Sequence, residues 1–161
     1  MSLTDKLEIT EVLHRYARAV DRKDFDAVAD CYFSDAIDNH GGYVGTVEGL
    51  IADMKVRHRT IDSSMHFVTN VLVDLVGDVA NVESYCLCYL RQDPGPDGRQ
   101  ARATIKCRYV DRFERRDGKW RIADRIVVFD ESVTEPVEDV LDPAWVRSRR
   151  SSEDPVFTRQ P

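Results

Sequence analysis

The chain has 161 residues, of which 42% are hydrophobic and 32% charged, and its formal net charge is −6. This length fits one domain, and no apolar run reaches the roughly 18 residues that a bilayer-spanning helix needs. The negative charge argues against the electrostatic footprint of a nucleic-acid-binding protein, and the N-terminus lacks the pattern of a secretion signal. We therefore expect a cytoplasmic domain with neither nucleic acid nor membrane as a partner.

The first third of the chain has helical periodicity. Residues 5–20 place apolar side chains three and four apart, which predicts a surface helix capped by Ser2 or Thr4. A second, short helix is expected to begin at Asp24. The segment 34–46 is interrupted by Gly41 and Gly42, which favours two short strands around a turn, and a third helix is expected over 47–59.

From residue 66 the apolar period changes to two. Strand-like runs cover 66–75, 79–91, 100–114 and 119–129, and Gly and Asp occupy the turns between them. This pattern predicts a four-stranded antiparallel meander. Helices followed by a meander are typical of an α+β domain in which the helices cover one face of a strongly curved sheet.

The last segment, 131–161, loses this pattern. Prolines interrupt it, and its few apolar residues suffice for one short amphipathic turn or helix: Val140, Leu141, Trp145 and Val146. We therefore expect a domain over 1–130, followed by a tail over 131–161 that is partly docked and has a disordered end. The docked part is predicted to cover a pocket mouth of its own chain or a neighbouring subunit.

The cysteines and one Asp–His pair offer little for a metal or a redox site. Cys86 and Cys88 lie two apart, which differs from the CxxC spacing of such sites, so we interpret all four cysteines as free thiols in the core. The sequence leaves open whether Cys86 and Cys88 or the alternating residues beside them face the inside of the sheet. Asp38 and His40 provide two candidate metal ligands without a third, so a turn histidine is the preferred interpretation. We expect neither a metal nor a cofactor.

A candidate acid–base pair comes from the first helix and the first long strand. The helix ends in Tyr16-Ala-Arg-Ala-Val-Asp21, and the strand is expected to open at His66. If the apolar stripe of the helix faces the sheet, Tyr16 points inward and Asp21 lies at the mouth of a cavity. A carboxylate that accepts a hydrogen bond from His66 would orient the ring and make its other nitrogen a general base. The alternative to a catalytic pair is purely structural: Asp21 ends the helix, and His66 is a histidine of the core.

Three stretches carry a resemblance to a known family: YARAVDRKDFDAVADCYFSDA (16–36), MHFVTN (65–70) and RYVDRFERRDGKWRIADR (108–125). Together with the order of elements they resemble the SnoaL-like branch of the NTF2-like cone fold, with the greatest likeness to hexachlorocyclohexane dehydrochlorinase, scytalone dehydratase and the bile-acid 7α-dehydratases. The resemblance implies an Asp–His dyad that works without a cofactor and falls on Asp21 and His66. It also matches Tyr16 to a dehydratase tyrosine and Arg125 to an active-site arginine of the dehydrochlorinase.

The resemblance implies a cofactor-independent lyase of the dehydratase type, or an isomerase, that acts on a hydrophobic and cyclic small molecule. In this hypothesis His66 removes an activated proton, Asp21 stabilises the imidazolium, and Tyr16 or Arg125 assists the leaving group. Epoxide hydrolysis and polyketide cyclisation remain open on the same scaffold, as does a non-catalytic binding or assembly module. We also expect a homo-oligomer, with a trimer favoured by the resemblance and a dimer as the alternative.

Overall fold

The computed structural model describes residues 2–138 and 140–159. Helix α1 spans Leu3–Arg22, longer at both ends than the apolar periodicity predicts. The predicted apolar stripe is buried, and Ser2 is the N-cap residue but makes no side-chain cap hydrogen bond. The helix ends because Lys23 adopts a left-handed conformation with φ of 56°, and the Asp24 amide then donates to the Ala19 carbonyl at 2.9 Å.

Two further helices follow the expected order. Helix α2 spans Phe25–Asp30 and is capped by Asp24, whose carboxylate accepts from the Ala27 amide at 3.1 Å. Helix α3 spans Val47–Arg57, and the short 3₁₀ turn η1 spans His58–Thr60. His58 in this turn is buried, and its Nδ1 lies 2.8 Å from the guanidinium of Arg150 in the tail.

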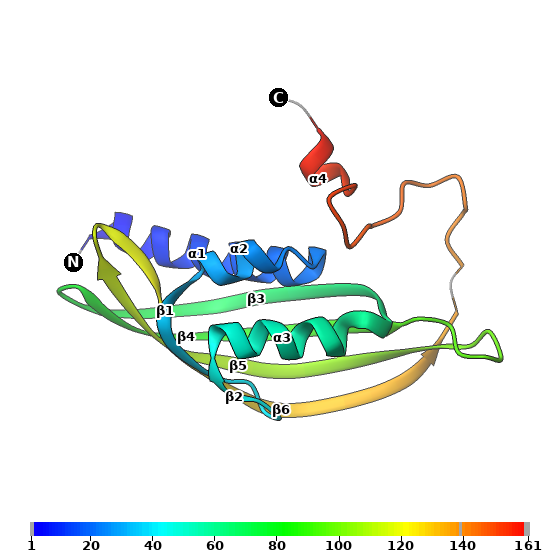
Figure 1. Ribbon diagram of the computed structural model, residues 1–161, viewed down its shortest axis with the longest axis horizontal. Coiled ribbons are helices and arrows are strands. Elements are labelled where there is room, and N and C mark those ends of the chain that lie inside the picture. The colour runs from blue at the N-terminus through cyan, green and yellow to red at the C-terminus, as the bar shows by residue number, and fades with distance from the viewer. Residues whose placement is uncertain (1, 139, 160–161) are drawn as a thin grey trace.

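The strands form one six-stranded sheet in the order β2-β1-β6-β5-β4-β3. All neighbours are antiparallel except β1 and β6, which are parallel. The strands span β1 Tyr32–Asn39, β2 Val44–Thr46, β3 Ile61–Val76, β4 Val79–Gln92, β5 Gln100–Arg116 and β6 Lys119–Val137. Figure 1 shows the sheet curving beneath α1 and α3, so the predicted α+β architecture is confirmed.

Two strand boundaries differ from the prediction in ways that affect the site. Strand β3 already begins at Ile61, so His66 lies within the strand rather than at its start. Strand β6 continues to Val137 and pairs with β5 along its whole length, beyond the expected domain boundary at 130. Both extensions are polar, and their strand conformation comes from pairing with a neighbour rather than from an apolar alternation.

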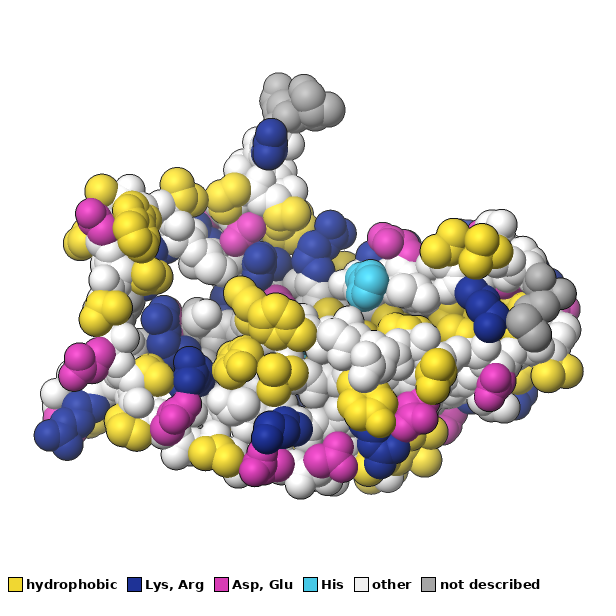
Figure 2. Space-filling model, turned by 180° about the vertical axis from the view of Figure 1, so that it is seen from behind, with side chains coloured by type: hydrophobic (Ala, Val, Ile, Leu, Met, Phe, Trp, Pro, Cys, Tyr) yellow, Lys and Arg dark blue, Asp and Glu magenta, His cyan; other side chains and the backbone are white. Residues whose placement is uncertain are grey.

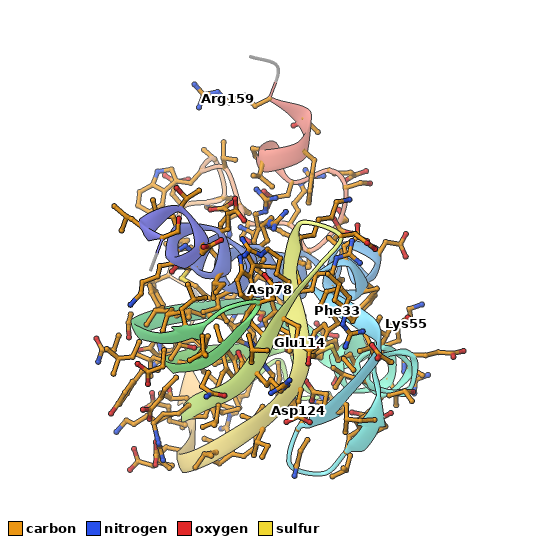
Figure 3. The ribbon with its side chains drawn as sticks, turned by 90° about the vertical axis from the view of Figure 1, so that its left-hand side faces the viewer. Phe33, Lys55, Asp78, Glu114, Asp124 and Arg159 are labelled. Atoms are coloured by element: carbon orange, nitrogen blue, oxygen red, sulfur yellow. The ribbon has the colours of Figure 1, made fainter. Side chains whose placement is uncertain are left out.

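One end of the molecule is held together by arginines of the β5–β6 hairpin, which Figure 3 views from that side. Arg116 binds the Asp35 carboxylate of β1 at 2.7 Å and stacks over the Phe33 ring. Arg115 binds Asp5 of α1 at 3.0 Å and Asp78 of the β3–β4 turn at 2.7 Å. These contacts fix α1 against the sheet at the end opposite Asp21.

The tail after β6 crosses back over the molecule and ends in the short helix α4, Pro155–Thr158 (Figure 1). Its apolar side chains at 140, 141, 145 and 146 are exposed. Arg150 and the buried Asp154 make the contacts with the domain, the latter through Arg22 at 3.3 Å. Residues 160 and 161 of the predicted disordered end lie outside the described residues.

Candidate active site

Asp21 lies in the last turn of α1, with its carboxylate directed at the concave face of the sheet. Oδ1 accepts from the Ser64 hydroxyl at 2.6 Å, and Oδ2 accepts from the His66 amide at 2.9 Å. The residue is buried, with 7% of its surface exposed. A carboxylate at a helix C-terminus faces the negative end of the helix dipole, so these donors offset an otherwise unfavourable position.

The His66 ring completes this arrangement. Its Nδ1 lies 2.6 Å from Asp21 Oδ1, and only 12% of its side chain is exposed. Because a carboxylate only accepts, Nδ1 carries the proton and donates it to Asp21. In the neutral imidazole, Nε2 is therefore the nitrogen with the free lone pair, and the ring has the tautomer that general-base chemistry requires.

The pKa values of the two groups move apart. Burial on its own would raise the pKa of Asp21, but the hydrogen bonds from His66 and Ser64 outweigh burial and lower it. Burial would likewise lower the pKa of His66, but the hydrogen bonds with Asp21 and Cys88 outweigh it and raise it to about 10. The ring therefore stays protonated to a higher pH than an ordinary histidine, and its neutral form, which can accept a proton at Nε2, becomes the major form only above about pH 10.

A thiol occupies the other side of the same ring. Cys88 lies opposite His66 in the β3–β4 register, and its Sγ is 3.2 Å from Nε2. The side chains of Ser64, His66 and Cys88 share the concave face, because alternate residues of a strand and their cross-strand partners point the same way. In the neutral tautomer, the Cys88 thiol is the donor to Nε2.

Tyr16 and Arg125 form a second, separate group. Arg125 is fully buried and binds both carboxylate oxygens of Asp111 at 2.7 Å. Its guanidinium also lies over the rings of Tyr16, at 4.4 Å, and Tyr109, at 4.1 Å. Burial raises the pKa of the Tyr16 phenol above its ordinary value, so the phenol stays protonated. The four predicted site residues thus fall into two pairs, Asp21 with His66 and Tyr16 with Arg125.

Asp38 and His40, the weak metal candidate, lie close together at the end of β1. His40 Nδ1 is 3.2 Å from Asp38 Oδ1, and the other oxygen of Asp38 accepts from the Tyr32 hydroxyl at 2.8 Å. Across residues 2–138 and 140–159, no group of three or more His, Cys, Asp or Glu side chains could hold a metal ion. Asp38 therefore belongs to the buried hydrogen-bond network in which the Tyr32 hydroxyl contacts both Asp38 and Arg125.

Arg150 of the tail covers the end of α1 beside the dyad. Its guanidinium donates to the carbonyls of Asp21 at 3.0 Å and Val20 at 2.9 Å, and to Ile61 of β3 at 3.0 Å. A cation at this place satisfies carbonyls that the helix end leaves unpaired and balances the negative end of its dipole. The tail therefore joins the C-terminal end of α1, which carries Asp21, to the start of β3.

Three residues of this site escaped the sequence analysis. Ser64 could have been found, because it lies two residues before His66 and so shares its strand face. Cys88 required the register between β3 and β4, which no local pattern contains. Arg150 required the path of the tail, and its basic neighbourhood at 147–150 gave no signal beyond surface charge.

A comparison with protein families shows which family the chain belongs to. The model of the SnoaL-like domain matches residues 1–126. The chain belongs to this SnoaL-like family. No curated protein matches it. Across the described parts of the chain, no helix is long and apolar enough to cross a membrane.

Solved structures of other proteins show the same fold. A protein from Novosphingobium aromaticivorans, proposed to be a scytalone dehydratase, is 16% identical with a TM-score of 0.73, covering 90% of this chain and 97% of its own. Hexachlorocyclohexane dehydrochlorinase type 3 from Novosphingobium barchaimii is 20% identical with a TM-score of 0.70, covering 88% and 97%. A Kribbella flavida protein is 18% identical with a TM-score of 0.73, covering 81% and 93%.

Proposed function

We propose that this SnoaL-like protein is a cofactor-independent lyase, of the dehydratase type, or an isomerase, and that Asp21 and His66 form its general-base dyad. The observation that carries the proposal is the 2.6 Å contact between Asp21 Oδ1 and His66 Nδ1, with the second carboxylate oxygen bound to the His66 amide. This double attachment fixes both the tautomer and the ring orientation, which are the two requirements of a positioned base.

The proposed reaction begins with His66 Nε2 removing a proton from a carbon next to a carbonyl group. The imidazolium that forms is stabilised by the Asp21 carboxylate, since burial strengthens their attraction. Elimination follows when a group on the neighbouring carbon leaves, and isomerisation follows when the proton returns elsewhere. Both outcomes share the first step. General-base assistance is worth about 10²–10⁴ in rate, so the substrate must already carry an activated C–H bond.

The resemblance makes Tyr16 the candidate hydrogen-bond donor to the leaving oxygen, and its phenol remains protonated, but it lies buried in the Arg125 group, so a substrate would have to reach it there. Arg125 acts through Tyr16 as a positioning residue. Its guanidinium is bound to both oxygens of Asp111 and lies 4.4 Å from the centre of the Tyr16 ring, so it fixes the ring rather than contacting a substrate.

The concave face suits a hydrophobic substrate. Beside Cys88 it carries the half-buried apolar side chains of Leu90 and Ile105, which continue the same face of β4 and β5. In Figure 1 the far ends of these strands extend beyond α3, where the helix no longer covers them. Together with the hydrophobic, ring-containing compounds in the names of the dehydratase and dehydrochlorinase relatives, this supports a cyclic hydroxy ketone as the substrate class.

A non-catalytic ligand-binding module is the second candidate. One observation favours it: His66 Nε2, the atom that must take the proton, already has the Cys88 thiol at 3.2 Å. A substrate must displace this contact before His66 can act as base. A binding module would take up the same ligands without turning them over.

The test is a screen of cyclic β-hydroxy ketones, followed by the ultraviolet absorbance of the unsaturated product. We expect Asp21→Asn and His66→Asn to lower turnover by about 10²–10⁴. His14→Asn is the matched control, because His14 is exposed on the same helix as Asp21. Ligand binding by the wild type without turnover of any compound would favour the binding module. Turnover that survives His66→Asn would refute the dyad.

A further inference from the structure

The contact between His66 and Cys88 has a chemical meaning that elimination does not use. Asp21 Oδ1, His66 Nδ1, His66 Nε2 and Cys88 Sγ lie in sequence, with 2.6 Å for the first contact and 3.2 Å for the last. An acid that orients an imidazole, whose second nitrogen meets a thiol, is the arrangement that activates a nucleophile. The thiolate is the reactive form of cysteine, and an acceptor for its proton lies in contact with it.

The contact with an imidazole distinguishes Cys88 from the other cysteines, although it is Cys86 whose pKa is lowered, to about 6, by its hydrogen bond with Cys107. All four thiols belong to buried residues, so exposure alone does not rank them. Cys31 donates to the carbonyl of Ala27 at 3.3 Å, and burial raises its pKa to about 11. Cys86 accepts from the Tyr109 hydroxyl at 3.3 Å and faces Cys107 across the β4–β5 register. Among these thiols, Cys88 is the one whose sulfur contacts an imidazole that is itself bound to a carboxylate.

We propose that Asp21, His66 and Cys88 form a nucleophilic triad, and that Cys88 adds to activated alkenes, the α,β-unsaturated carbonyl compounds, that reach the concave face. The proposal uses the Asp21–His66 contact but does not depend on elimination. Leu90 and Ile105, half-buried beside Cys88, give the apolar surface on which the alkene would lie.

The addition balances without an oxidant or a cofactor. From the neutral form of the His66 ring, the proton of the Cys88 thiol moves to Nε2, and the thiolate sulfur then forms a bond to the β-carbon of the alkene. The π-electron pair of the C=C bond moves toward the α-carbon as an enolate, and the imidazolium returns its proton there. The product is a saturated carbonyl compound held by a thioether bond, and the reverse steps release it. The proposed lyase reaction would generate an alkene of this class in the same place.

The experiment measures the rate at which each cysteine of the full chain reacts with N-ethylmaleimide, a small activated alkene. Limited labelling at pH 7 is followed by digestion and mass spectrometry, which separates Cys88 from Cys86. We expect Cys88 to react at least about tenfold faster than Cys31, which is equally buried, because Cys31 has no proton acceptor of this kind. His66→Asn should bring Cys88 down to the rate of Cys31, whereas His14→Asn should leave the ratio unchanged.

Several outcomes would overturn the proposal. The proposal is wrong if, in the wild type, Cys88 reacts with N-ethylmaleimide no faster than Cys31. It is also wrong if His66→Asn leaves the labelling rate of Cys88 unchanged. Circular dichroism checks the fold of each variant, and Asp21→Asn provides the same comparison if His66→Asn does not fold. Fast labelling of Cys88 in a protein that turns over no hydroxy ketone would support the triad and reject the lyase, so the two proposals fail separately.

Discussion

At the scale of single residues, Asp21 organises the site because its carboxylate accepts three hydrogen bonds. Its carboxylate receives the Ser64 hydroxyl, the His66 amide and the His66 ring, so each of its oxygens has a fixed partner. A buried charge is tolerated only when it is paired and hydrogen-bonded in this way. The same contacts that stabilise the carboxylate also orient the ring, so folding and the geometry of the site are coupled here.

This coupling predicts a pH dependence of stability. The pKa of His66 is raised from 6.5 to about 10 in the folded protein. The protonated ring therefore stabilises the fold fully below pH 6.5, and this contribution is lost as the pH rises through about 10. We expect His66→Asn to lower the free energy of unfolding by about 1.5–3 kcal/mol near pH 6, the usual worth of hydrogen bonds to charged groups, and by less as the pH rises to 10.

Urea denaturation of the wild type and His66→Asn at pH 6, 8 and 10 measures this difference, with His14→Asn as control. Titrations common to the proteins cancel in the difference. If the difference in the free energy of unfolding between the wild type and His66→Asn stays constant from pH 6 to 10, or grows with pH, Asp21 does not hold the His66 proton.

At the scale of elements, the sequence predicted what depends on local periodicity. The buried stripe of α1, the turn signals of the meander and the α+β order are all confirmed, because each follows from spacing along the chain. The polar start of β3 and the polar end of β6 were missed, since pairing with a neighbouring strand sets them. The site divides in the same way. The resemblance pointed to Asp21 and His66, whereas Cys88 and Arg150 reach them through tertiary contacts.

The tail gives a prediction at this scale. Truncation after Asp130 would cut β6, so the informative truncation comes after Val137, where the strand ends. We expect that protein to fold but to lose turnover or substrate binding, because the cover over the end of α1 is gone. Arg150→Met should reproduce part of this loss and lower the free energy of unfolding by about 1–3 kcal/mol, since carbonyls of α1 and β3 lose their donor.

Arg159→Met is the matched control, because Arg159 is an exposed arginine of the same tail (Figure 3). Hydrogen exchange of residues 151–158 measures docking independently of activity, and Arg150→Met should speed it. Exchange and turnover that match the wild type in Arg150→Met would show that the tail is incidental to the site.

At the scale of the whole molecule, the sheet leaves one face without helices. Large apolar side chains on this outer face are exposed in the single chain: Met65, Phe67, Leu72, Tyr85, Val110 and Ile126. Elsewhere on the surface, hydrophobic side chains reach solvent in clusters separated by charges (Figure 2). Exposed apolar side chains that share one sheet face are candidates for a contact site.

We therefore expect a homo-oligomer, with the trimer favoured by the resemblance. Light scattering at micromolar concentration should give a multiple of the 18.5 kDa chain mass. Phe67→Glu should shift the distribution toward the monomer, whereas Leu7→Glu, at an exposed apolar position on α1, should not. A wild-type mass equal to that of one chain would contradict this expectation.

The measurement that tests the central claim most directly is hydrogen–deuterium exchange at carbon. A cyclic ketone that carries no leaving group is incubated with the protein in deuterated water, and mass spectrometry follows deuterium entering next to the carbonyl. Proton abstraction is then observed alone, whether the natural reaction is elimination or isomerisation. We expect catalysed exchange with the wild type and with His14→Asn, and loss of this exchange in His66→Asn although the ketone still binds. Exchange that persists in His66→Asn, or its absence for every ketone that the wild type binds, would contradict the Asp21–His66 base.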